Sequence, residues 1–549
     1  MKLTTEMRQG NKRKNRLLSI PLRLTAFLAV LMILSVWPGE FVGQKGQRGC
    51  TMILVGKQAT ADGSVLMSYS NDWDGKGASH VVFVPRAEHK AGETIKLTDG
   101  AEIPQALTTY AYIGNELMWT DHSTFENGIN EHQVAICFGT AVEVNPKARE
   151  VDPLLGEKDK NPGILIPWRL VLERAKTAKE GVELVEKLFN QYGLREDGSF
   201  AIADPNEIWV FQIGGGHHWA AMRVPDDSYV VYDNTFRMGE INCGDRANYR
   251  CSPNLVQFSI EKGLFDPASG PFSFKKAWGR VFTKTPPADR RIWRVQSLLT
   301  SGSSFSPDTP YFDYPLALPP DQKITKEKLM SIMRDHYEGS KLDLTDNYKK
   351  ANPHHTSERT LCVTRTQYTV ITQLRSWFPG EIGGVFWLAM ANPDISAFIP
   401  WYQGITETPP AFRSGSGRSD QESAYWAFKR IGVLVNVFYG ELIGQVRSVW
   451  KALEDDAFAQ QDSIEKTALE LFSKDVALAK GFLTAYSNAL AFKAYQTAQT
   501  MIEDLETRCV ELQNRQIEKS SWVGWNEGQE TLVQRQGKKG SEGEYNQIY

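Results

Sequence analysis

The feature that most constrains the fold is a cysteine placed at the start of a β-hairpin pattern. Cys50 is followed by the apolar run Thr51 to Val55, a turn at Asp62-Gly63, and a second apolar run from Val65 to Tyr69. Apolar, β-rich runs on either side of an Asp-Gly turn are typical of two antiparallel strands. The sequence therefore predicts that Cys50 stands directly before the first strand of a hairpin.

The residues before Cys50 have the pattern of an export signal. Residues 1–23 carry seven basic side chains and one acidic side chain, and the 14 residues from Leu24 to Trp37 carry no charge. An apolar stretch of this length is typical of a signal-peptide core and is short for a bilayer span. We therefore expect residues 1–39 to be a signal peptide and residues 40–49 to be a short propeptide stub. An uncleaved membrane anchor is the alternative.

Removal of those residues would leave Cys50 with both a thiol and a free α-amine. The amine titrates at roughly 7.7–8.0 and the thiol at about 8.5, so a near-neutral base would stand beside the nucleophile. Pairing a nucleophile with an N-terminal amine is a known way to activate Ser, Thr or Cys. A cut directly before Cys50 or autocatalytic removal of the stub could expose it. A lipid-modified cysteine is a third reading, which the polar residues Gln47-Arg48-Gly49 disfavour.

Composition excludes several classes of protein. The chain has 549 residues, and its 41% hydrophobic and 11% aromatic residues are ample for a packed core. Residues 1–49 hold nine of the 62 basic residues but two of the 65 acidic ones, so the remainder carries about −10. This negative charge argues against a nucleic-acid-binding protein, because such binding depends on neutralising phosphates. The six cysteines are too sparse to hold the fold together, although Cys243 and Cys251 could pair, and no metal-ligand spacing is present.

The rest of the chain reads as strands, then helices, then strands again. This order suits an antiparallel sheet layered with helices. A turn at 128–131 is expected to lead into a strand at 134–138, and residues 417–521 are expected to be mainly helical. The other expected helices are 167–175, 180–192 and 325–337; a four-strand meander is expected at 199–204, 207–213, 218–224 and 229–234, and a later strand pair at 360–372 and 384–390.

Several sequence blocks occur in the order of a known family. They are 50–57 with 61–64, 127–135, 214–219 with 223–227, 333–339, 375–379 and 382–387. In these blocks the chain resembles the C69 dipeptidases, a family of N-terminal-nucleophile cysteine hydrolases, from Cys50 to about residue 515. The resemblance implies an α+β fold, a four-layer αββα sandwich of antiparallel sheets, and hydrolysis of short peptides without metal or organic cofactor. We expect a catalytic core at 50–415, a helical region at 416–521 and a polar, disordered tail at 522–549.

The resemblance also implies catalytic roles for three residues. Cys50 would be the nucleophile. Asn234, at the end of the strand that starts at residue 229, would donate its side-chain amide to the oxyanion, or else cap a turn. Asp72 would hold the substrate or the Cys50 ammonium, or else serve as a turn residue. Related enzymes often carry an arginine shortly before this acid, and here Tyr69 and Ser70 occupy that stretch.

Three further residues are candidates for substrate binding. Asn71 ends the second hairpin strand beside Asp72, and Thr140 could donate to the oxyanion. Arg223 could bind the carboxylate of a dipeptide, or form a surface ion pair instead. The adjacent His217 and His218 are expected to be structural, because neighbours on a strand point to opposite faces.

The leading hypothesis is an exported cysteine dipeptidase that reaches the periplasm, the cell surface or the medium. A related amidase that acts on acylated amino acids is the alternative enzyme, and a lipid-anchored surface binding protein is the alternative from another class. We expect short peptides as substrates, no nucleic acid, and no stable membrane partner after processing. We also allow for a homo-oligomer.

Overall fold

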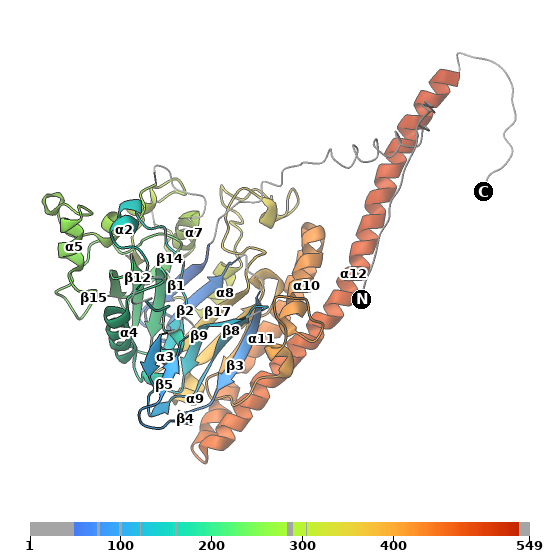
Figure 1. Cartoon of the computed structure of the whole chain (residues 1–549). Helices are drawn as coiled ribbons and strands as arrows, with labels where there is room; N and C mark the ends of the chain where they lie inside the picture. Colours follow the sequence, from blue (N-terminus) through green and yellow to red (C-terminus); the bar gives the residue numbers. More distant parts are fainter. Residues whose placement is uncertain are drawn as a thin grey trace, which may run out of the picture. The chain divides into compact units, whose positions relative to one another are not determined.

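The computed structural model describes residues 49–536 apart from 74–76, 98–100, 121, 157–158, 160–162, 283–288 and 303–304 (Figure 1). The expected signal peptide and all but the last residue of the expected stub lie outside these residues. In the described part of the chain, no helix is both long enough and apolar enough to cross a bilayer.

The hairpin expected after Cys50 is present at the centre of a seven-stranded antiparallel sheet. In it β1 (Thr51–Val55) pairs with β2 (Val65–Asn71), and Thr51 lies opposite Ser70. Gly63 in the turn has a φ of 82°, which glycine adopts without strain. The strand order is β16 (Ala317–Leu318), β14 (Tyr229–Tyr232), β1, β2, β17 (Tyr368–Leu374), β18 (Val385–Met390) and β19 (Ile399–Tyr402).

A second, eight-stranded antiparallel sheet packs against the first. Within it, Asn115 pairs with Asn127 but Glu116 pairs with Phe125, so Glu126 is one extra residue and forms a β-bulge. The strand order is β15 (Tyr249–Cys251), β13 (Trp219–Arg223), β12 (Ile208–Ile213), β11 (Gly198–Ala203), β10 (Ala135–Cys137), β9 (Ser123–Asn130), β8 (Tyr112–Met118) and β3 (Ala78–Val84). Two short pairs join β4 (Ala87–Glu88) to β7 (Thr108–Thr109) and β5 (Thr94–Lys96) to β6 (Glu102–Pro104).

The predicted four-strand meander is wrong at its last strand. Strands β11, β12 and β13 are neighbours, but β14 crosses to the other sheet and pairs with β1. The turn after β13 explains the crossing, because the Gly56 N–H donates to the Ser228 carbonyl at 3.0 Å. A Cβ on Gly56 would lie 2.4 Å from the Pro225 carbonyl oxygen, so only glycine allows this close approach. The turn therefore lies against the end of β1 and directs β14 alongside it.

Helices cover the outer faces of both sheets. On the eight-stranded sheet lie α3 (Trp168–Arg174) and α4 (Ala178–Tyr192), which ends as expected at Gly193, where φ is 70°. On the seven-stranded sheet lie α7 (Arg290–Leu299), α8 (Lys326–Met333), α10 (Ala424–Val437) and α12 (Val476–Gln536). The order of helices, sheet, sheet and helices confirms the predicted αββα class (Figure 1). The other helices are α2 (Pro146–Val151), α5 (Leu255–Glu261), α6 (Phe274–Trp278), α9 (Gly380–Gly383) and α11 (Tyr439–Phe472).

Several predicted boundaries differ from the structure. Residues 128–130 belong to β9, so the expected turn falls instead at 131–134, where Gln133 has a φ of 58°. Helix α8 ends at Met333, and β17 begins at Tyr368. Helix α12 continues to Gln536, so residues 522–536 are helical where a disordered tail was expected. Their Glu, Gln and Arg residues are good helix formers, and polarity alone does not end a helix.

Candidate active site

Cys50 lies directly before β1 and is only 6% exposed. The Tyr69 hydroxyl donates a hydrogen bond to its sulfur at 3.2 Å. Continuing the β1–β2 register by one residue places Cys50 opposite Asn71, and Asn71 lies opposite Tyr368 of β17. Residues directly opposite each other in a sheet point to the same face. Cys50, Asn71 and Tyr368 therefore form a row across three neighbouring strands, which we call the Cys50 row.

The surroundings of Cys50 favour the neutral thiol over the thiolate. Burial and the nearby charge of Asp72 raise the pKa of the Cys50 thiol to about 11, against the lowering effect of the Tyr69 hydroxyl. At pH 7 only about one thiol in 10⁴ would then be ionised. A positive charge beside the sulfur, such as an α-ammonium group, would lower this pKa.

Asp72 is held rigidly beside the thiol. Its carboxylate accepts hydrogen bonds from Ser70 Oγ at 3.0 Å, from Arg359 Nη2 at 2.6 Å and from Thr366 Oγ1 at 2.6 Å. The side chains of Asp72 and Arg359 are fully buried, so their charges compensate each other out of water. Arg359 also donates to the carbonyl oxygen of Gly49. A guanidinium group therefore reaches the site from a distant segment, although Tyr69 and Ser70 occupy the stretch before Asp72.

Arg291 of α7 links the backbone of Cys50 to Asn234. Its Nη1 donates to the Cys50 carbonyl oxygen at 2.6 Å and to Thr51 Oγ1 at 2.8 Å, and its Nη2 donates to Asn234 Oδ1 at 2.7 Å. The Asn234 amide nitrogen donates to the Ala141 carbonyl at 2.9 Å and keeps a second hydrogen for another acceptor. Asn234 thus has a fixed orientation with its amide hydrogens directed away from Arg291.

Gly49 fills a narrow space between these groups. A Cβ at this position would lie 3.0 Å from Asn234 Oδ1 and 3.2 Å from two nitrogens of Arg359. These contacts are tighter than ordinary side-chain packing. The peptide bond before Cys50 is therefore enclosed by the same side chains that surround the thiol.

The structure does not bring all the candidate binding residues to Cys50. The Thr140 hydroxyl shares a hydrogen bond of 2.7 Å with Ser199, in the segment that also contacts Asn234. Arg223 is paired with Glu207 at 3.1 Å and with Asp226 at 2.6 Å. Asp226 contacts the chain just after β1, where its carbonyl accepts from the Gln58 N–H. That point is about 20 Å along the strand from Cys50, since a strand rises roughly 3.3 Å per residue.

A buried carboxylate stands over the Cys50 row. Glu126 Oε2 accepts hydrogen bonds from Asn71 Nδ2 at 2.6 Å and from the Tyr368 hydroxyl at 2.5 Å. Burial raises the pKa of Glu126 to about 7, although hydrogen bonds from Tyr368, Asn71 and Thr124 act to lower it. The Glu126 charge in turn contributes to the raised pKa of the Cys50 thiol. Asn71 and Tyr368 of the row therefore hold an acid close to Cys50.

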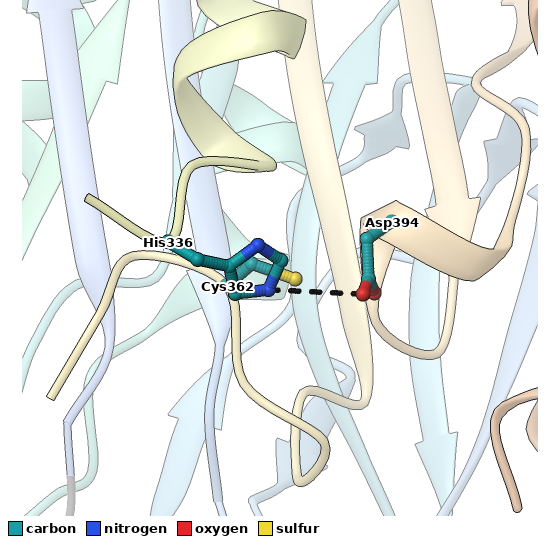
Figure 2. A group of neighbouring side chains, drawn as sticks. All are labelled: His336, Cys362 and Asp394. Carbon is teal, nitrogen blue, oxygen red and sulfur yellow. Dashed lines mark ion pairs between the residues drawn. The ribbon is translucent and has the colours of Figure 1, made fainter. Parts of the chain in front are cut away.

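A second buried cluster could hold a metal ion by position. Figure 2 shows His336, Cys362 and Asp394 directed toward one another, and their ligand atoms lie within 4.8 Å of one another. Asp394 already accepts hydrogen bonds from Asn392 Nδ2 at 2.6 Å and from the Tyr439 hydroxyl at 2.7 Å, and His354 Nε2 lies 3.1 Å away. Protein donors thus satisfy this carboxylate without a cation. A cavity of about 540 Å³ lies against Asp394, between α8 and α11, and not at Cys50.

The expectation that His217 and His218 point to opposite faces is wrong. Both precede β13 in a loop, and their Nδ1 atoms lie 3.0 and 2.8 Å from the two carboxylate oxygens of Asp152. A loop has no strict alternation of side chains, so adjacent residues can converge on one partner. Their structural role is consistent with this Asp152 contact.

Sequence reasoning missed most of the residues that surround the thiol. Arg291 and Arg359 occur in polar stretches without a distinctive pattern, and Tyr368 and Glu126 occur within ordinary strand patterns. The one signal available was the missing arginine before Asp72, which implied a compensating cation elsewhere. No sequence pattern indicated which of the many arginines supplies it.

The family model and the curated relatives agree with the resemblance. A model of peptidase family C69 matches residues 49–452. A probable dipeptidase of Salmonella dublin is 31% identical over 377 residues, which cover 67% of this chain and 83% of the relative. A probable dipeptidase of Latilactobacillus sakei is 27% identical over 475 residues, which cover 84% and 96%. Among solved structures, a mutant of the conjugated bile acid hydrolase from Clostridium perfringens is 13% identical with a TM-score of 0.24, covering 62% of this chain and 89% of that one.

Proposed function

The chain belongs to peptidase family C69, and on this basis we propose that it is an exported cysteine dipeptidase whose nucleophile is Cys50. One observation carries the proposal. Groups on both sides of the Gly49–Cys50 peptide bond are bound by the site. The Tyr69 hydroxyl donates to the buried Cys50 sulfur, and Arg359 donates to the Gly49 carbonyl oxygen. Cleavage of this bond would create an α-amine beside the sulfur, inside a site that is already assembled.

The free amine would supply the base that the uncleaved chain lacks. It takes the thiol proton, and the sulfur attacks the carbonyl carbon of the substrate to form a tetrahedral oxyanion. We propose that the second amide hydrogen of Asn234, which the bond to Ala141 leaves available, donates to this oxyanion. The resulting ammonium then protonates the leaving amine, and water hydrolyses the thioester. Asp72, held by Arg359, would stabilise the ammonium form between these steps.

Of the two processing routes, the contacts at Gly49 favour autocatalytic removal. The donor on the Gly49 carbonyl polarises the bond that the adjacent thiol would attack, and the attack transfers the acyl group from nitrogen to sulfur. Water then hydrolyses the thioester, which frees the thiol and leaves the amine unacylated. Processing would in this way switch the dipeptidase on.

Intact-mass analysis of purified wild-type and Cys50→Ala protein tests this proposal. Wild-type protein is expected to begin at Cys50 and to hydrolyse dipeptides, whereas Cys50→Ala is expected to keep upstream residues and to be inactive. Undiminished activity in Cys50→Ala would refute the nucleophile. A cut before residue 50 in that variant would show that another protease does the processing. Mass analysis of protein from the cell envelope and medium, compared with cytoplasmic protein, tests export.

A further inference from the structure

The Cys50 row carries a binding site for one end of the substrate. Resting on the proposed function, we propose that Glu126 binds the α-ammonium group of the dipeptide. The enzyme would thereby select peptides with a free amino terminus over N-acylated peptides and N-acylated amino acids.

The β-bulge in β9 is what places this carboxylate. In a regular strand Glu126 and Asn127 would point to opposite faces. Because Glu126 is the extra residue of the bulge, both side chains reach the same tyrosine: Asn127 Nδ2 donates to the Tyr368 hydroxyl at 2.5 Å, and that hydroxyl donates to Glu126 at 2.5 Å. Bulges commonly redirect side chains next to active sites. Here the redirected group is an acid in the space between the two sheets.

The contacts of Glu126 place its carboxylate about the length of one amino-acid residue away from the Cys50 thiol. Glu126 is bound by Asn71 and Tyr368, and Asn71 is the direct neighbour of Cys50 in the row. Directly opposite residues have Cβ atoms about 4.5–5.5 Å apart. The α-nitrogen of a dipeptide lies roughly 2.5 Å from the carbonyl carbon that sulfur attacks, given standard bond lengths. Asn71 therefore holds the Glu126 carboxylate at a distance from Cys50 that suits contact with the α-ammonium group of a bound dipeptide.

The charge of Glu126 also lacks a partner. Within the described part of the chain, no Arg, Lys or His forms an ion pair with it, and its bonds come from neutral amide and hydroxyl groups. By contrast, the buried acids Asp72 and Glu465 are paired with Arg359 and Arg375. A buried carboxylate without a counter-ion is costly. A cationic ligand would remove that cost, and the α-ammonium is the cation every unmodified dipeptide carries beside its scissile bond.

The test compares kcat/KM of mature wild-type and Glu126→Gln protein on a dipeptide and on the same dipeptide N-acetylated. Wild type is expected to prefer the free amine. Glu126→Gln should lose about 30-fold or more on the free dipeptide, the usual scale for removing one member of a buried charge pair, and little on the acetylated one. Glu126→Asp keeps the charge but shortens its reach, so it should retain part of the preference.

Glu131→Gln is the matched control, because it removes a carboxylate in the turn directly after β9 that is already paired with Arg86 at 2.5 Å. This variant should leave kcat/KM unchanged for both the free and the acetylated dipeptide. An unchanged preference in Glu126→Gln, or an equal loss on both substrates, would overturn the inference while leaving the dipeptidase intact. Equal loss would also be the result if Glu126 served the ammonium of Cys50 itself. Wild-type protein that cleaves only acylated substrates would instead refute the proposed function.

Discussion

Glu126 should make the folded protein less stable as the pH rises through neutrality. Its pKa is raised by burial from an ordinary 4.5 to about 7. The folded state therefore holds a proton that the unfolded chain has lost between these values, and stability falls across this window. Since a tenfold change in proton affinity is 1.36 kcal/mol, the full loss by pH 8 is about 3 kcal/mol.

The change Glu126→Gln keeps the shape of the side chain and removes the titration. Its carbonyl oxygen can accept the hydrogen bonds from Asn71 and Tyr368 that Glu126 accepts now. The variant should match wild type near pH 4 and exceed it at pH 8 by up to about 3 kcal/mol. For a folded unit of roughly 480 residues this is about 3 °C in Tm, because the unfolding entropy scales with chain length.

Differential scanning calorimetry from pH 4 to pH 8, without peptide present, measures the difference between the two proteins. Glu131→Gln again serves as the control and should not reproduce the gain at high pH. Parallel Tm curves for wild type and Glu126→Gln would refute the reasoning, as would a variant that is less stable than wild type at pH 8. Either result would mean that the carboxylate is already compensated in the folded protein.

Three other changes have defined outcomes. Arg291→Lys should lower kcat/KM for dipeptides at least 10-fold with Tm nearly retained, because an ammonium group cannot replace the planar guanidinium that donates to three acceptors. An unchanged rate would contradict this. Gly49→Val should slow processing severely, as followed by intact mass, because its side chain would collide with Asn234 and Arg359; processing at the wild-type rate would show that this space is not confining. Dialysis against a strong chelator should leave Tm unchanged, because protein donors already satisfy Asp394, and a fall in Tm restored by Zn²⁺ would show that the cluster binds metal.

Local sequence patterns predicted the elements that short-range physics determines. The Asp62-Gly63 turn specifies the β1–β2 hairpin, and the apolar spacing of residues 180–192 specifies α4 and its end at Gly193. The same patterns do not say which sheet a strand joins. They predict β14 beside β13, whereas in the structure β14 pairs with β1. That choice depends on the close approach at Gly56, which involves residues far apart in the chain.

The candidate site likewise contains residues that local sequence patterns predict and residues that they do not. Cys50, Asn71, Asp72 and Asn234 lie at the ends of strands that could be recognised, and the structure gathers them with Arg291. Glu126 depends on a one-residue bulge, which leaves no mark in a strand pattern. Groups that act through such irregularities, or through arginines from remote loops, are found only once the strands are paired.

The pairing of β2 with β17 has a consequence for how the chain matures. Asn71 meets Tyr368 across this pairing, and Arg359, just before β17, reaches back to Asp72 and Gly49. Such long-range contacts form late, because a large loop must close first. If the proposed cleavage of the Gly49–Cys50 bond depends on these contacts, it cannot occur until most of the chain has been synthesised and the central sheet is complete. Release of the new amino terminus would then act as a folding checkpoint, so that peptide-cleaving capacity arises only in molecules that have reached their native topology.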